Sequence, residues 1–201
     1  MRRARAARGE AAPRTTDFSA APPLAGARVA LRALSLDDAP ALFAIFSDRS
    51  VTRYWSRPPM THLAQARALV RDVHAGYRSG ELLQWGVTRP DEREVIGTCT
   101  LFHFSRACRR AELGYALASR HWGQGLMHDA LCTLVAHAFD TLDLLRLEAD
   151  IDPANAASAR ALARLGFVKE GHLRERWIVG DVVTDSEVYG LLRREWRNPA
   201  A

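Results

Sequence analysis

Apolar and polar residues alternate along the chain with two different periods, and each period predicts a type of element. Val29, Leu31 and Ala33 are apolar at every second position, which is typical of a strand. Apolar residues then recur at helical spacing in residues 35–46 and again in residues 61–80. The first of these segments opens on a serine, a favoured helix cap, and the second closes on a glycine, a favoured helix end.

The rest of the chain continues to alternate between strands and helices. Three strand-like segments with short connections predict an antiparallel meander, at residues 82–88, 95–104 and 111–118. There follow a helical stripe, a strand and a short helix, at residues 127–139, 145–151 and 155–165. Two final strands flank Gly180 and Asp181, a two-residue hairpin signal, at residues 168–179 and 182–192.

The order β-α-α-β-β-β-α-β-α-β-β predicts one α/β (α+β) domain around a mixed, mostly antiparallel sheet with flanking helices. A length of 201 residues suits one domain and is short for two. Residues 1–23 are rich in Arg, Ala and Pro, and we expect a disordered tail there, followed by the domain at residues 24–198.

Composition restricts the classes of protein to which this chain can belong. With 48% hydrophobic and 25% charged residues, and no apolar run of about 20 residues, the chain reads as a soluble protein without a membrane partner, and we expect it in the cytoplasm. The net charge is +5, but residues 1–23 carry five arginines against two carboxylates, so the domain itself is only mildly basic. It has no basic stripe with interleaved aromatics, so no specific nucleic-acid partner is expected.

Cysteine and histidine give no sign of a metal site. The three cysteines form no CxxC pair, and the seven histidines are scattered without a second ligand at metal-binding spacing. We therefore expect neither a disulfide framework nor a bound metal.

A glycine-containing turn marks the candidate site. The strand at residues 111–118 runs into Arg120, Gly123, Gln124 and Gly125, after which a long helix begins. Unpaired N–H groups and partial positive charge at a helix N-terminus suit a phosphate, and glycines let the backbone approach it. A tight strand-to-helix turn that binds nothing is the alternative, because both the full dinucleotide fingerprint and the Walker loop are absent.

The surrounding sequence resembles one family. The pattern Arg120-x-x-Gly123-x-Gly125 is similar to the pyrophosphate signature of the GNAT acetyltransferase superfamily. Flanking blocks at residues 111–117 and 155–167 look like its RimJ/RimL-type branch, which acetylates protein N-termini and other amines. The resemblance extends from about residue 26 to residue 196. It implies acetyl-CoA as cosubstrate.

The resemblance also implies which residues hold acetyl-CoA. In this family the strand matching residues 111–118 splays from the parallel strand matching residues 145–151, and the pantetheine arm lies in the gap. Main-chain groups of Leu117 and Ala118 would contact pantetheine and thioester, and Asn155 would contact the arm across the gap. The pyrophosphate would lie against Arg120, Trp122, Gly123, Gln124, Gly125, Leu126 and Met127.

Acetyl transfer needs a neutral amine, a donor for the oxyanion and a proton for the leaving thiolate. Glu112, on the strand before the loop, is the candidate base; the alternative is an ordinary strand glutamate paired with Arg109 or Arg110. Ser158 is the candidate acid, one helical turn after Asn155, and a helix-capping or surface serine is the alternative.

Tyr115 alternates with Glu112 along the strand, which favours core packing for the tyrosine. Residues that could line an acceptor pocket are Tyr54, Trp55, Trp85 and His103, each of which could also be a core or rim residue.

These patterns predict an N-acetyltransferase that transfers acetyl directly, in a ternary complex, to a primary amine. The amine is a protein N-terminus or a small molecule. A base matters less for an α-amine, with a pKa near 8, than for a lysine-like amine, with a pKa near 10.4. A catalytically silent, CoA-binding regulatory domain is the alternative. Both a monomer and a homodimer fit the sequence.

Overall fold

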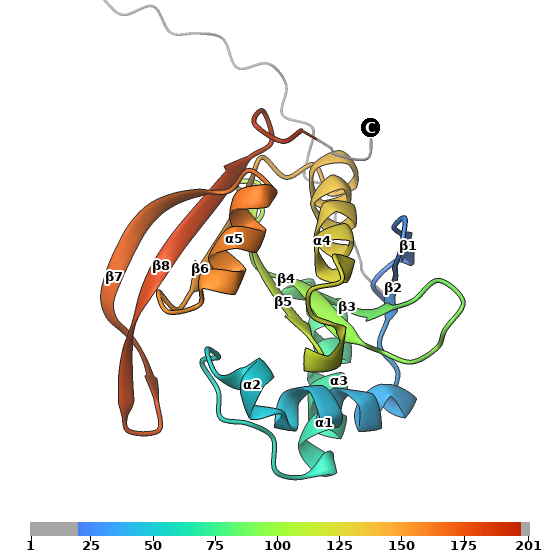
Figure 1. Cartoon of the computed structure of the whole chain (residues 1–201). Helices are drawn as coiled ribbons and strands as arrows, with labels where there is room; N and C mark the ends of the chain where they lie inside the picture. The colour runs from blue at the N-terminus through green and yellow to red at the C-terminus, as the bar shows by residue number, and fades with distance from the viewer. Residues whose placement is uncertain (1–19, 198–201) are drawn as a thin grey trace, which may run out of the picture.

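The computed structural model describes residues 20–197. An eight-stranded sheet in the order β1-β2-β3-β4-β5-β6-β8-β7 forms the centre, with helices packed against it (Figure 1). Only the pair β5 and β6 is parallel among the neighbouring strands of this sheet. The predicted mixed, mostly antiparallel α/β domain is therefore confirmed.

The elements follow the predicted order with small additions. The strands are β1 (Leu24–Ala25), β2 (Ala30–Ala33), β3 (Leu82–Thr88), β4 (Gly97–Ser105), β5 (Arg110–Leu117), β6 (Arg146–Ile151), β7 (Val168–Val179) and β8 (Val182–Leu192). The helices are α1 (Ala39–Ser47), α2 (Arg49–Thr52), α3 (Leu63–Ser79), α4 (Leu126–Ala136) and α5 (Ala156–Arg164). The hydrophobic pattern did not predict β1 and α2, because segments of two and four residues are too short to show a period.

Capping explains where the first helices begin. Ser35 and Asp38 form a capping box around one turn of 3-10 helix that leads into α1. Helix α3 begins two residues after the predicted start at residue 61; its cap is His62, whose main-chain N–H donates to the side chain of Gln65 at 3.0 Å. Gly80 ends α3 in the left-handed conformation, with φ of 70°.

Helices cover both faces of the sheet. Alternate residues of a strand face opposite sides, so Leu82 of β3 and Cys99 of β4 mark the two faces. Leu82 lies against Gly76 of α3, where a Cβ would be 2.7 Å from that of Leu82. Cys99 lies 3.8 Å from the sulfur of Met127 at the start of α4. Thus α3 covers one face and α4 the other.

The parallel strands β5 and β6 separate along their length. They pair only from Arg110 with Arg146 to Glu112 with Glu148, although β5 continues to Leu117 and β6 to Ile151. Beyond Glu112 the two strands have no paired residues, which opens a wedge between them. The splay expected from the family resemblance is present.

Two further features bound the domain. The hairpin of β7 and β8, which turns at Gly180, extends as a long ribbon at one side of the molecule (Figure 1). Residues 20–23 lie against the domain, because Ala21 is buried and the carbonyl of Pro22 accepts from Nε1 of Trp85 at 2.7 Å. Of the tail predicted for residues 1–23, residues 1–19 lie outside the described residues.

Across residues 20–197, the helices are all too short or too polar to span a bilayer. The same part of the chain brings no three of its His, Cys, Asp and Glu side chains together as a metal site.

Candidate active site

The glycine loop has the backbone that its sequence predicts. Gly123 and Gly125 have φ values of 72° and 74°, in the left-handed region that residues with a Cβ rarely adopt. Gly125 is the N-cap of α4, so the loop delivers the chain directly into the helix. A Cβ on Gly123 would have nothing within 4 Å, which leaves this side of the loop open to a ligand.

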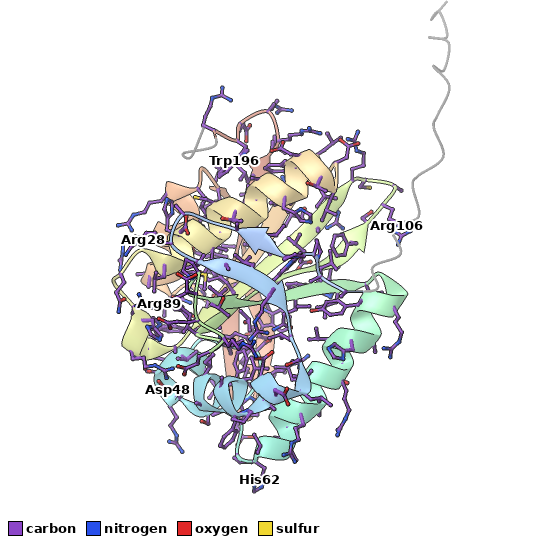
Figure 2. The ribbon with its side chains drawn as sticks, turned by 90° about the vertical axis from the view of Figure 1, so that its right-hand side faces the viewer. Arg28, Asp48, His62, Arg89, Arg106 and Trp196 are labelled. Atoms are coloured by element: carbon purple, nitrogen blue, oxygen red, sulfur yellow. The ribbon has the colours of Figure 1, made fainter. Side chains whose placement is uncertain are left out.

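Two arginines from distant segments contact the loop, and a third, Arg120, belongs to the loop itself. Arg28 donates to the main-chain oxygen of Gln124 at 2.7 Å, and Arg89 donates to its side-chain oxygen at 3.1 Å. Figure 2 shows Arg28 and Arg89 on the same side of the molecule. Arg120 donates to Glu94 at 2.5 Å. Burial, followed by the charge of Arg120, lowers the pKa of His121. The loop therefore lies in a positive environment suited to phosphates.

Sequence reasoning missed Arg28 and Arg89, because neither lies near the loop in the chain. It also missed Asp129, in the first turn of α4, whose carboxylate accepts from the main-chain N–H groups of Ala27, Arg28 and Val29 at 3.2, 2.8 and 3.1 Å. Asp129 thus anchors the segment that carries Arg28 to the start of α4. An acidic residue near a helix start is a common pattern and does not by itself identify such a tether.

Main-chain groups of β5 line one side of the wedge. Ala118 N–H donates to Ile96, so Leu117 and Gly97 form a pair without mutual hydrogen bonds. The N–H and C=O of Leu117, and by alternation those of Tyr115, therefore point toward β6. The carbonyl of Leu117 accepts from Nε1 of the half-exposed Trp122 at 2.8 Å.

The main-chain N–H and C=O of Ala118 both form hydrogen bonds within the protein. Its N–H donates to the carbonyl of Ile96 at 2.9 Å, and its carbonyl accepts from the N–H of His121 at 2.9 Å. Of the two positions predicted to contact pantetheine, Leu117 faces the wedge and Ala118 does not.

Helix α5 lines the other side of the wedge. Asn155 is its N-cap, and its side-chain oxygen accepts from the N–H of Ser158 at 3.1 Å. The side chain of Ser158 is buried, and its Oγ lies 2.6 Å from the hydroxyl of Tyr115. Ser158 is therefore not a surface serine. Burial raises the pKa of Tyr115 to about 12.

Glu112 lies on the opposite face of β5 from Tyr115. Its Oε1 is 3.0 Å from Nδ1 of His103, a residue at a β-bulge with φ of 49°. The alternative partners predicted for Glu112 are engaged elsewhere, since Arg110 pairs with Glu148 and Arg109 with Asp143.

The remaining predicted residues divide between loop and core. Leu126 is buried and Met127 contacts Cys99, so both side chains pack inside the domain. At the start of α4, only the main-chain groups of these two residues can therefore face a ligand. Trp85 is a core residue with no exposed surface. Trp55 packs on Phe46, at 4.9 Å between ring centroids, in the segment that follows α2.

One contact connects the junction of α1 and α2 to the site. Asp48, between α1 and α2, accepts from the hydroxyl of Ser119 at 2.6 Å and from the N–H of Ser50 at 2.8 Å. These bonds, the one from Ser119 foremost, lower the pKa of Asp48. The end of β5 and the α1–α2 segment are thereby held together beside the wedge.

Comparison with known proteins decides the family. Residues 28–168 match the family described as "Acetyltransferase (GNAT) domain". The chain belongs to the GNAT acetyltransferases. This GNAT chain is 34% identical over 166 residues to the N-acetyltransferase YoaA of Bacillus subtilis, covering 83% of the chain and 94% of the relative. It is 31% identical over 134 residues to the ribosomal protein uS5-alanine N-acetyltransferase of Escherichia coli, covering 66% and 68% of the two chains.

A solved structure gives the same result. Mycobacterium smegmatis RimJ in complex with CoA-disulfide superimposes with a TM-score of 0.76 at 26% identity, covering 87% of each chain. The acetyltransferase described here is thus an enzyme that transfers acetyl from acetyl-CoA to an amine, and the RimJ-like branch predicted from its motifs is confirmed.

Proposed function

We propose that this enzyme acetylates the α-amine of a protein N-terminus, with acetyl-CoA lying in the wedge between β5 and β6. The observation that carries the proposal is the separation of these strands beyond Glu112 and Glu148, directly beside the open glycine loop. The wedge supplies main-chain groups for an extended arm, and the loop supplies a helix N-terminus for phosphates.

The phosphates of acetyl-CoA lie against the loop and the arginines around it. The N–H groups at the start of α4 point toward them, and Arg28, Arg89 and Arg120 add charge. The pantetheine arm contacts the outward main-chain groups of Leu117 on one side and Asn155 on the other. The cosubstrate residues are Arg28, Arg89, Leu117, Arg120, Trp122, Gly123, Gln124, Gly125, Leu126, Met127 and Asn155.

Glu112 acts as the general base, directly or through a water, on the face of the sheet away from α4. It is a quarter exposed and free of an arginine partner, so its carboxylate can accept a proton. Ser158 acts on the other face, beside the wedge, and gives its proton to the leaving thiolate. A base and an acid on opposite sides of the thioester suit direct transfer in a ternary complex.

Two considerations favour a protein N-terminus as acceptor. The Escherichia coli relative is named for acetylating the alanine of ribosomal protein uS5. An α-amine also has a pKa near 8, so its deprotonation near pH 7 costs only about 1–1.5 kcal/mol, against roughly 4–5 kcal/mol for a lysine-like amine. Glu112, whose only salt-bridge partner among the described residues is the imidazole of His103, is therefore a sufficient base for an α-amine.

The test is thiol release from acetyl-CoA over a panel of acceptors: peptides with free N-terminal alanine or serine, the same peptides blocked at the N-terminus but carrying lysine, and polyamines. We expect the free α-amine peptides to have the highest kcat/KM. A preference for polyamines or for lysine contradicts the acceptor class, and binding of acetyl-CoA without turnover on any amine contradicts the catalytic role of the wedge.

Variants in the same assay test the base. Glu112→Gln should lower kcat on the order of a hundredfold, the lower range for loss of a general base, with KM for acetyl-CoA little changed. Glu148→Gln is the matched control, because Glu148 lies beside Glu112 in register but is paired with Arg110 and Arg146. It should cost stability and spare kcat. Equal kcat in the two variants would exclude Glu112 as the base.

A further inference from the structure

Tyr115 joins the two sides of the wedge. Its ring starts on β5, and its hydroxyl reaches α5, 2.6 Å from Oγ and 3.4 Å from the carbonyl oxygen of Ser158. The two residues are 43 positions apart in the chain, so only the packing of α5 against β5 brings them together. Tyr115 is therefore a second polar group at the place where Ser158 acts.

Either hydroxyl can donate in this contact, and the phenol of Tyr115 is the stronger donor because a phenol is more acidic than an aliphatic alcohol. A hydroxyl has one hydrogen and two acceptor lone pairs. Burial raises the pKa of Tyr115 to about 12, so its phenol keeps its proton at any pH at which the enzyme works. When Tyr115 donates to Ser158 Oγ, the hydroxyl hydrogen of Ser158 is not used in this bond and points away from the tyrosine ring. A serine hydrogen directed in this way is available to the sulfur of the leaving group.

The surroundings of Tyr115 keep its hydroxyl in place and neutral. Cys99 is its cross-strand neighbour on β4, and it lies against Met127 at the start of α4. Burial raises the pKa of the Cys99 thiol well above its usual range, so no thiolate competes for the hydrogen of Tyr115. Asn155 fixes the other partner by capping the helix turn that carries Ser158. Both hydroxyls thus have defined positions.

We propose that Tyr115 is a positioning residue that orients the hydroxyl of Ser158 toward the thioester sulfur. This inference rests on the proposed role of Ser158 as the proton donor. The overall proton balance is unchanged by it: the proton on the sulfur comes from Ser158, which regains one from solvent, and Tyr115 only donates a hydrogen bond throughout.

The test is a double-mutant cycle on kcat with Tyr115→Phe, Ser158→Ala and the double variant. Tyr115→Phe should lower kcat roughly tenfold, the factor expected for one hydrogen bond to a reacting group, with KM for acetyl-CoA within about twofold of wild type. Because Tyr115 acts through Ser158, adding Tyr115→Phe to Ser158→Ala should lower kcat no further.

Tyr77→Phe is the matched control for loss of a buried tyrosine hydroxyl. Tyr77 lies on α3, on the other face of the sheet; its pKa is also raised to about 12 by burial, and it donates to the carbonyl of Gln84. This variant should lower the melting temperature as much as Tyr115→Phe does, while kcat stays at the wild-type value.

Each outcome of the cycle has one meaning. Wild-type kcat in Tyr115→Phe, together with low kcat in Ser158→Ala, overturns the positioning role and leaves the acid assignment intact. Effects that multiply in the double variant overturn it too, because Tyr115 then acts independently of Ser158. Wild-type kcat in Ser158→Ala refutes the acid itself, while thiol release by the wild-type enzyme still reports on the proposed function.

Discussion

Two glycines with the same backbone requirement lie in different parts of the molecule. Gly123 in the loop and Gly180 in the hairpin turn have φ values of 72° and 61°, and a Cβ on either would meet nothing within 4 Å. The left-handed conformation alone therefore requires glycine at both positions for the fold. Only Gly123 is next to the proposed phosphate site.

This pair separates folding from binding. Alanine at either position should lower the free energy of unfolding by about 1–2 kcal/mol, the cost of a left-handed residue with a Cβ. Gly123→Ala should also weaken acetyl-CoA binding roughly tenfold, because the Cβ lies on the open side of the loop, whereas Gly180→Ala should leave the affinity unchanged. Calorimetric titration with acetyl-CoA measures the difference, and equal affinities would remove Gly123 from the phosphate site.

Single residues of the site were predictable where their own conformation or motif identifies them. Gly123, Gly125, Asn155 and Ser158 belong to the blocks that resemble the family, and all lie at the wedge or its loop. Tyr115 was assigned to core packing from strand alternation, which placed it correctly on the face opposite Glu112 but could not reveal its contact with Ser158.

At the scale of elements, the N-terminal segment is fastened to α4 by one side chain. Asp129 accepts three main-chain N–H groups from residues 27–29, far away in the chain. These bonds hold the turn between β1 and β2 beside the glycine loop. They also set the position from which Arg28 reaches Gln124.

Replacing this carboxylate should affect both stability and binding. Asp129→Asn should lower the free energy of unfolding by about 1–3 kcal/mol, because charge-assisted bonds to three main-chain N–H groups are weakened, and should weaken acetyl-CoA binding as Arg28 shifts. Asp140→Asn, an exposed position beyond the end of α4, is the control and should change neither. Urea unfolding and acetyl-CoA titration of both variants measure this. Unchanged affinity in Asp129→Asn would show that Arg28 does not depend on the tether.

At the scale of the whole molecule, a part-buried ion pair connects three segments. The carboxylate of Asp38, before α1, accepts hydrogen bonds from both terminal nitrogens of Arg32 in β2, at 2.7 and 2.8 Å. Arg32 also donates to the carbonyl of Arg93, in the β3–β4 connection, at 2.6 Å. Burial alone would raise the pKa of Asp38, but the bonds from Arg32 and Ser35 outweigh it, and the pKa is lowered.

Because the pKa of Asp38 is lowered in the folded state, the free energy of unfolding depends on pH. Asp38 stabilises the fold fully above the unfolded pKa of about 3.9, and this contribution is lost as the pH falls through the lower folded pKa. Asp38→Asn should lower the free energy of unfolding by about 1–3 kcal/mol at pH 7, since Arg32 is partly exposed and screened. Denaturant unfolding at pH 7 and pH 3 should show the gap to wild type narrowing in acid. A gap of constant size would mean that the Asp38 pKa is not lowered.

The sequence by itself determined what depends on neighbouring residues. Period, caps and hairpin signals set the order of strands and helices, and the glycines at 123 and 125 set the loop, because each is a local demand on backbone conformation. The tertiary structure decided which distant groups meet. Arg28 reaches Gln124 across 96 positions and Tyr115 reaches Ser158 across 43, and the N–H of Ala118 donates to Ile96. Such contacts follow from strand register and helix packing, which no local pattern encodes.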